Sequence, residues 1–215
     1  MDDFDKELER RGHTFCRYAD DCNIYVNSLK AGERVLSSVT RFLEGKLKLR
    51  VNCAKSAVGF AEERKFLGYR LLKGGRLGIA PKSLTRAKDR VREITRRNRG
   101  HVKVREMIAE LNNCLSGWVT YFRLADCRRH LKRIGEWIRR KLRCVILKRL
   151  KRTKTIADWL RRRGVPERRS WIMALSGKGW WRKSGTPQAN EAMGNDWFVE
   201  MGLLDPLEKY QTLQN

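Results

Sequence analysis

The 215-residue sequence has no apolar run close to the roughly 20 residues that a membrane-spanning helix requires. Its opening stretch, MDDFDKELERRGH, is acidic and polar, whereas a signal peptide begins with basic residues and continues with apolar ones. No C-x-x-C pair occurs among its six cysteines, so neither a zinc site nor a disulfide framework is indicated. We therefore expect a cytoplasmic protein that has no membrane partner and whose cysteines are reduced.

Acidic residues are few. The 24 aspartates and glutamates stand against 49 lysines and arginines, which gives a formal charge of +25 and a pI of about 10.5. An excess of this size predicts a polyanionic partner, and nucleic acid is the first candidate. The alternative is a charged surface without a specific partner. The excess is concentrated between residues 81 and 183, whereas residues 184–215 are mildly acidic.

The first third of the sequence predicts strands and one helix. Residues 14–18 and 22–26 are rich in aromatic and β-branched types and are separated only by ADD, as in a tight β-hairpin. The segment GERVLSSVTRFLEGKL has the apolar spacing of an amphipathic helix. The segments LKLRV, SAVGF and RKFLGYRLL predict further strands, and the glycines and proline of KGGRLGIAPKS indicate a boundary near Pro81.

Beyond Pro81 the pattern is helical. The segment SLTRAKDRVREITRRNR predicts a helix capped by Ser83 and ended by Gly100. Two apolar stripes at helical spacing follow: Val104, Ile108, Leu111, Leu115, Trp118 and Phe122, and then Leu131, Ile134, Ile138, Leu142 and Val145. Three such helices with short links predict a small bundle. We expect three parts, at residues 1–81, 82–152 and 153–215, of which the last is basic and tryptophan-rich with a mildly acidic tail.

Two adjacent carboxylates, Asp20 and Asp21, lie at the tip of the predicted hairpin. Oxygen ligands held side by side suit hard divalent cations such as Mg²⁺. Mg²⁺ in turn indicates phosphoryl transfer, in which metal ions activate the attacking hydroxyl and stabilise the leaving oxygen. The alternative is a simple polar turn, since aspartate is common in turns.

Several segments occur in an informative order. YADD, LKLRVNCAKS and FLGY are followed by REITRRNRG, IAELNNCLSGWVTYF and WIRRKLR. Together they resemble group II intron-encoded reverse transcriptases and maturases over nearly the whole chain. The resemblance implies an α+β protein in which a partial reverse-transcriptase palm, an antiparallel sheet plus a helix, precedes an all-helical thumb or maturase bundle.

The resemblance also implies roles for single residues. YADD, from Tyr18 to Asp21, would be the polymerase box, with Asp20 as the more direct Mg²⁺ ligand and Asp21 beside it. Lys55 would protonate the pyrophosphate leaving group, and a solvated surface lysine is the alternative. FLGY would be the strand that grips the primer end, and its residues are Phe66, Leu67, Gly68 and Tyr69. An ordinary core strand is the alternative for FLGY.

The sequence departs from the family at its start. Members carry fingers and the first palm strands, including another metal-binding aspartate, before YADD, whereas this sequence begins at the helix that precedes it. Asp2, Asp3 and Asp5 would lie on that helix and are poor substitutes for a carboxylate on a facing strand. We therefore expect no DNA polymerisation by this chain alone. An N-terminal reverse-transcriptase fragment or self-association could complete it, and a poorly folded pseudogene product is a further alternative.

The basic helices predict contacts with phosphate. The expected nucleic-acid-binding residues are Arg96, Arg97, Arg99, Arg139, Arg140, Lys141, Arg143, Arg161, Arg162, Lys178 and Arg182. In the family this block holds primer and template and binds intron RNA, which splices by its own transesterification. The implied partners are group II intron RNA and, as a further partner, a DNA primer or target. Generic basic nucleic-acid binding is the alternative.

A tryptophan-rich segment lies near the C-terminus. Trp171, Trp180 and Trp181 occur with cationic residues, as in a stacking surface for unpaired bases. Tryptophans buried in a core are the alternative. The three histidines are far apart and have no zinc spacing, so a nuclease module of the HNH type is not expected.

Overall fold

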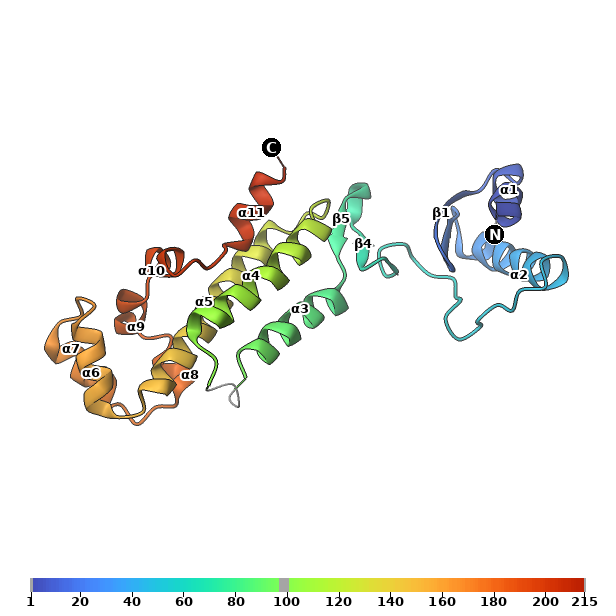
Figure 1. The fold of residues 1–215 in the computed structure, drawn as a ribbon. Coiled ribbons are helices and arrows are strands. Elements are labelled where there is room, and N and C mark those ends of the chain that lie inside the picture. Colours follow the sequence, from blue (N-terminus) through green and yellow to red (C-terminus); the bar gives the residue numbers. More distant parts are fainter. Residues whose placement is uncertain (1, 97–100, 215) are drawn as a thin grey trace. The chain divides into compact units, whose positions relative to one another are not determined.

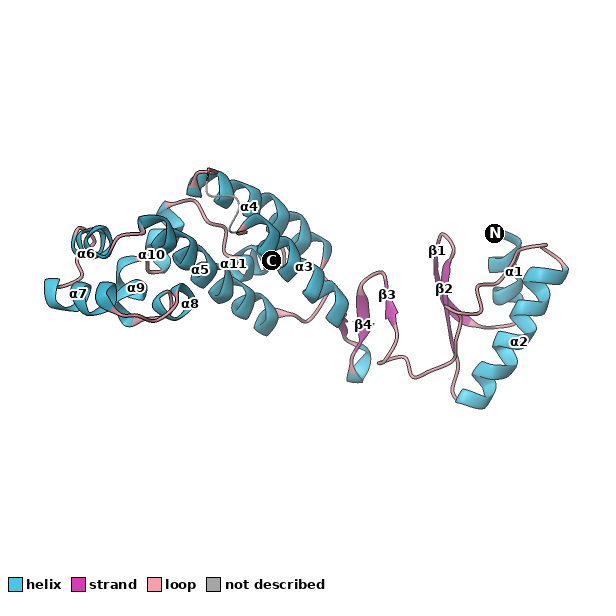
Figure 2. Ribbon diagram, turned by 90° about the horizontal axis from the view of Figure 1, so that it is seen from below, coloured by secondary structure: helices cyan, strands magenta, loops and turns pink. Residues whose placement is uncertain are grey.

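The computed structural model describes residues 2–96 and 101–214. The chain divides between Ala80 and Pro81 into two compact units, which are described separately (Figure 1). The first contains helices and two small antiparallel sheets, and the described part of the second is helical (Figure 2). The predicted α+β class, with a sheet-containing part before a helical part, is confirmed.

Four elements open the first unit: helix α1 (Asp2–Arg10), strands β1 (Thr14–Tyr18) and β2 (Asp21–Tyr25), and helix α2 (Leu29–Gly45). The two strands form the predicted antiparallel hairpin. Phe4 and Leu8 lie four residues apart on one face of α1, and both are buried in a small core with Val39 of α2. Phe15 and Ile24, paired across the hairpin, pack against the same core. The hairpin therefore has one face covered by the two helices.

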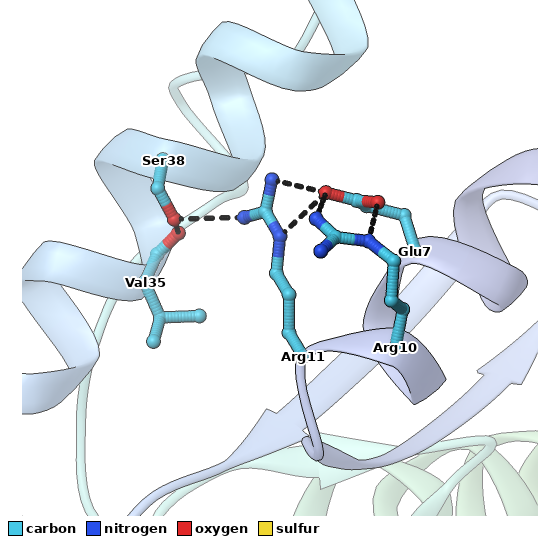
Figure 3. A network of polar contacts seen from close by, with 5 residues as sticks. All are labelled: Glu7, Arg10, Arg11, Val35 and Ser38. Atoms are coloured by element: carbon cyan, nitrogen blue, oxygen red, sulfur yellow. Dashed lines mark hydrogen bonds and ion pairs between the residues drawn. The ribbon is translucent and has the colours of Figure 1, made fainter.

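Polar contacts also join α1 to α2 (Figure 3). Arg11 donates from Nε to Glu7 Oε1 at 2.8 Å and from Nη1 to Ser38 Oγ at 3.2 Å, and Ser38 Oγ donates to the carbonyl of Val35 at 3.1 Å. Arg10 donates to Glu7 as well. These hydrogen bonds from Arg10 and Arg11 lower the pKa of Glu7 to about 2. The carboxylate thus stays ionised and positions Arg11, directly after α1, for its hydrogen bond to Ser38 of α2.

A second antiparallel sheet consists of β3 (Lys65–Phe66), β4 (Tyr69–Leu71) and β5 (Leu77–Ile79), with the short 3₁₀ helix η1 (Lys73–Gly75) before the last strand. The strands predicted for LKLRV and SAVGF are wrong, because residues 47–51 and 56–60 are irregular. Strand composition produces a strand only where a neighbour accepts its hydrogen bonds. No strand in the described ranges pairs with either segment, and Leu49 and Phe60 are exposed.

Three long helices form the bundle of the second unit: α3 (Pro81–Ile94), α4 (Val104–Tyr121) and α5 (Arg128–Leu150). The predicted stripes are confirmed, since their central residues are buried: Ile108, Leu111, Leu115, Leu131, Ile138 and Leu142. Helix α3 begins at Pro81 and is not capped by Ser83, because the fixed φ and missing N–H of proline suit the first helical position. Gly100 lies outside the described residues.

Six shorter helices follow: α6 (Thr153–Arg161), α7 (Glu167–Leu175), α8 (Trp180–Lys183), α9 (Pro187–Ala192), α10 (Asn195–Glu200) and α11 (Pro206–Thr212). Helices α6 and α7 pack on each other, while α8 and α11 pack on α5. One hydrophobic core continues from α3 to Phe198 of α10 and Leu203 after it. Among the described helices, none combines the length and apolarity needed to cross a bilayer.

The segment after α10 is fastened to the bundle by contacts that we call the C-terminal seam. Asn112 of α4 donates from Nδ2 to the carbonyl of Gly202 at 2.6 Å, and its Oδ1 accepts from the amide of Leu204 at 2.9 Å. The hydroxyl of Tyr210 donates to the carbonyl of Ala125 at 2.9 Å, in a buried position. An asparagine side chain carries an NH₂ donor group beside a carbonyl acceptor, so it can pair with a backbone segment much as a neighbouring strand would.

Candidate metal site and nucleic-acid interface

The two aspartates lie where the β1–β2 hairpin turns. Asp20 follows Ala19 in the two-residue turn, and Asp21 opens β2 opposite Tyr18. Ala19 has a φ of 50°, in the left-handed region that costs a residue other than glycine of order 1–3 kcal/mol. Both carboxylates are exposed, and neither has a hydrogen bond or ion pair with another side chain in the described chain. The hairpin thus presents two unpaired carboxylates at a strained turn.

Arg17 connects this tip to helix α1. Its guanidinium forms a two-pronged ion pair with Asp5, and its Nη1 donates to the carbonyl of Ala19 at 2.9 Å. The hydrogen bonds from Arg17 lower the pKa of Asp5. Asp5 is therefore occupied by a cation and is not available as a ligand beside Asp20. The sequence analysis missed this pair, since nothing in the local pattern indicates that α1 and β1 bring these two residues together.

The tip fits part of a Mg²⁺ site. Mg²⁺ at a phosphate site is usually held by one or two carboxylates together with waters and substrate phosphates, which matches the donors of Asp20 and Asp21. Within the described ranges no cluster of three or more His, Cys, Asp or Glu side chains is placed to hold a metal ion. A second Mg²⁺ ion, bridged as in two-metal phosphoryl transfer, would need a further carboxylate.

The other two predicted polymerase features have simple local structures. Lys55 is exposed in a turn whose amides, at Lys55 and Ser56, both donate to the carbonyl of Asn52. The prediction that Phe66 to Tyr69 form one strand is wrong: Leu67 and Gly68 have φ values of 51° and 80° and make the two-residue turn between β3 and β4. Two successive residues with positive φ are typical of a two-residue hairpin turn. Glycine is preferred as the second of these residues.

The basic residues of α5 divide into paired, buried and open ones. Arg139 donates from Nη1 to Asp205 at 3.0 Å, so its charge is matched by the C-terminal segment. The prediction that Arg143 lies on an exposed face is wrong. Arg143 is 9% exposed and its Nε donates to the carbonyl of Met193 at 3.0 Å. Burial, together with the nearby guanidinium groups of Arg139 and Arg140, lowers the pKa of Arg143.

Arg140 and Lys141 lie beside the tryptophan-rich segment. Arg140 donates to the carbonyl of Trp181 at 3.2 Å, and its Cζ is 4.3 Å from the centroid of the Trp181 ring. Trp181 is 41% exposed, whereas Trp171 and Trp180 are partly buried against the core. Of the three tryptophans, two follow the core interpretation and one presents an open aromatic surface.

The remaining predicted nucleic-acid-binding residues differ in how far their charge is compensated. The side chains that are exposed and have no ion pair in the described chain are Arg96, Arg162, Lys178 and Arg182. Arg161 is also exposed, but it lies 3.6 Å from Asp158 and 3.4 Å from Glu167. Arg97 and Arg99 lie outside the described residues.

The start of α5 carries a basic cluster that the sequence analysis did not single out. We call Arg128, Arg129, Lys132 and Arg133 the α5 basic patch. All four side chains are exposed, and within the described residues none has an ion pair. The first turn of α5 contains no acid, so Arg128 and Arg129, which lie in that turn, oppose the helix dipole. The run RRHLKR is the sequence signal from which this patch could have been predicted, because its cations occur on both sides of one buried leucine, Leu131.

Two protein families match the chain. The reverse transcriptase (RNA-dependent DNA polymerase) family matches residues 1–71, and the group II intron, maturase-specific domain matches residues 84–164. The chain belongs to the group II intron reverse transcriptase and maturase family. A comparison with curated proteins found no significant match.

The two matches cover most of the sites of this group II intron protein. The reverse transcriptase match contains Asp20, Asp21, Lys55 and the β3–β4 turn. Members of that family use divalent metals such as Mg²⁺. The maturase-specific match contains most of α3 and all of α4, α5 and α6, and therefore the α5 basic patch. Trp181 lies beyond both matched ranges.

Proposed function

We propose that this group II intron protein binds the RNA of its intron and assists splicing. The observation that carries the proposal is the α5 basic patch, because it lies within the maturase-specific match and none of its cations has an ion pair in the described chain. Cations in the first turn of a helix reduce its stability. Their presence is understandable if they meet an external anion, and the phosphates of RNA are the anions that a net charge of +25 favours.

Splicing assistance requires shape recognition and cations from the protein, since the RNA carries out the transesterification. Of the predicted phosphate-contacting residues, we retain Arg96, Arg140, Lys141, Arg162, Lys178 and Arg182, and add the α5 basic patch. We do not retain Arg139 and Arg161, which are paired with acids, or Arg143, which is buried. Arg97 and Arg99 stay predictions. The division of the chain into parts at residues 1–81, 82–152 and 153–215 stays a prediction.

We further propose that the 215-residue chain alone does not extend a primer. Asp20 and Asp21 supply ligands for one Mg²⁺, and when bound the ion would stabilise charge on phosphate oxygens. Asp5, the aspartate of α1 nearest to β1 in sequence, is held by Arg17. Lys55 is proposed to meet the pyrophosphate leaving group, and residues 66–69 to contact the primer end.

RNA binding is tested with the whole chain and a labelled group II intron RNA over a range of salt concentrations. The variant in which all four patch residues become glutamine should bind more weakly. The slope of log K against log salt should decrease by up to about 3, at about 0.7–0.9 for each phosphate contact. Arg161→Gln is the matched control, because Arg161 is exposed but already paired with acids. Equal slopes for the patch variant and wild type would contradict the proposal.

Splicing assistance is measured as the rate of intron excision at a Mg²⁺ concentration too low for the RNA alone. The chain should raise this rate, and Asp20→Asn should raise it equally, because the carboxylates are not required for RNA-catalysed splicing. If the chain binds intron RNA tightly but does not raise the rate of excision, only the alternative of generic nucleic-acid binding would remain.

A second candidate function is reverse transcription with a partner, which the unpaired carboxylates of Asp20 and Asp21 favour. The partner would be a second copy or a reverse-transcriptase fragment that supplies a further carboxylate. Primer extension on an RNA template with Mg²⁺ tests this at increasing protein concentration. Extension by wild type that is lost in Asp20→Ala would establish it and would overturn our proposal of an inactive chain.

A further inference from the structure

Two tryptophans of the second unit are bridged by cations. Lys141 Nζ lies 5.7 Å from the ring centroid of Trp137 on α5 and 5.8 Å from that of Trp181 on α8. Arg92 of α3 lies 5.6 Å from the Trp137 ring, and Arg140 lies 4.3 Å from the Trp181 ring. These five residues come from three helices and are connected by the contacts of Lys141 with both rings, and we call them the cation–aromatic strip.

Internal packing accounts for Trp137, which lies against the hydrophobic core, but not for the Trp181 end of the strip. Trp181 is 41% exposed although a tryptophan buries a large apolar area when it enters a core. Arg140 and Lys141 have no ion pair in the part of the chain that the structure describes. Arg92 is paired with Asp89 at 2.6 Å. The Trp181 end of the strip therefore combines an open aromatic surface with uncompensated positive charge.

The Trp181 end is also preorganised. The Arg140 guanidinium is held by its hydrogen bond to the Trp181 carbonyl, and a Cβ added to Gly185 would come within 3.0 Å of it. Lys178 and Arg182, which flank Trp181 in sequence, are exposed and unpaired in the described residues. A ligand that fits must bring a flat apolar face for the ring and negative charge for the surrounding cations.

We propose that an unpaired segment of RNA binds the cation–aromatic strip, with a base stacked on Trp181 and its flanking phosphates beside Lys141 and Arg140. Bases within a duplex have both faces covered by their neighbours, so only an unpaired base can stack on a side chain. The inference rests on the proposed RNA-binding function and specifies which form of RNA this surface recognises.

The test uses the whole chain and a 12-nucleotide single-stranded RNA with 2-aminopurine, whose fluorescence is quenched by stacking, near its centre. Trp181→Ala should weaken binding about 5- to 150-fold, as for the loss of one stacked base, and should remove the quenching. Trp181→Phe, which keeps an aromatic ring, should retain most of the binding affinity and most of the quenching. Tyr121→Ala is the control, because Tyr121 is 53% exposed but belongs to α4. Circular dichroism melts verify that each variant is folded.

The outcomes separate this inference from the proposed function. Undiminished binding and quenching in folded Trp181→Ala, with intron RNA still bound, would overturn the stacking proposal and leave the proposed function standing. Failure of the wild-type chain to bind either intron RNA or the single strand at low salt would overturn both. Tighter, Trp181-dependent binding of the matching single-stranded DNA would overturn the assignment to RNA.

Discussion

Removing the side chain of Asn112 should loosen the C-terminal seam. Asn112→Ala deletes two hydrogen bonds, to Gly202 and Leu204, at a partly buried position. At about 1 kcal/mol net for each bond the loss is about 2 kcal/mol. The better helix propensity of alanine offsets about 0.6 kcal/mol of this. The free energy of unfolding should therefore fall by about 1.5 kcal/mol, and Tm by about 5 °C.

A neighbouring residue provides the control. Asn113 is exposed on the same helix and has no side-chain partner in the described chain, so Asn113→Ala should leave Tm unchanged or slightly raised. Thermal melts followed by circular dichroism at 222 nm measure both variants. Limited trypsin digestion gives a local readout, because a loosened seam should be cut faster after Lys209. Equal melting and equal digestion of the two variants would refute the role assigned to Asn112.

Three further predictions concern the hairpin and the seam. Ala19→Gly should stabilise the first unit by up to about 1 kcal/mol in urea unfolding, because it relieves a positive φ; a clear loss of stability would contradict the strain. The pKa of Asp5 is lowered by Arg17, so the stability from this pair is present above pH 4 and lost as pH falls below it. Asp5→Asn should therefore show a smaller drop in urea midpoint between pH 6 and pH 3 than wild type, and parallel curves would exclude the pair as a cause. Tyr210→Phe leaves the buried carbonyl of Ala125 without its donor and should lower unfolding free energy by about 1–2 kcal/mol, whereas no change in a urea melt would mean that water replaces the hydroxyl.

Periodic features of the fold were predictable from the sequence, because they depend on neighbours in the chain. The hairpin at residues 14–25 follows from strand composition on both sides of a short turn, and the buried stripe through Leu111 and Leu115 follows from helical spacing. The failures at LKLRV and SAVGF have the opposite cause. A strand needs a partner from elsewhere, and composition does not report whether one is present.

The candidate sites show the same limit. The exposure of Asp20 and Asp21 followed from their place at a turn. The pairing of Arg139 and the burial of Arg143 could not be predicted from local sequence. They depend on Asp205 and Met193, which are distant in sequence. Spacing along a helix places a residue on a face, but it does not reveal which later segment covers that face.

The C-terminal seam has a consequence for how the second unit folds. Its hydrogen bonds join residues 85 to 92 positions apart, whereas the contacts within each helix are local. Closing so long a loop costs conformational entropy, and the hydrogen bonds of the seam offset this cost only after they have formed. We therefore expect the seam to form after the folding transition state, so that Asn112→Ala accelerates unfolding and leaves the refolding rate nearly unchanged. The lifetime of the folded unit, more than the speed at which it is reached, is then set by its most distant contacts.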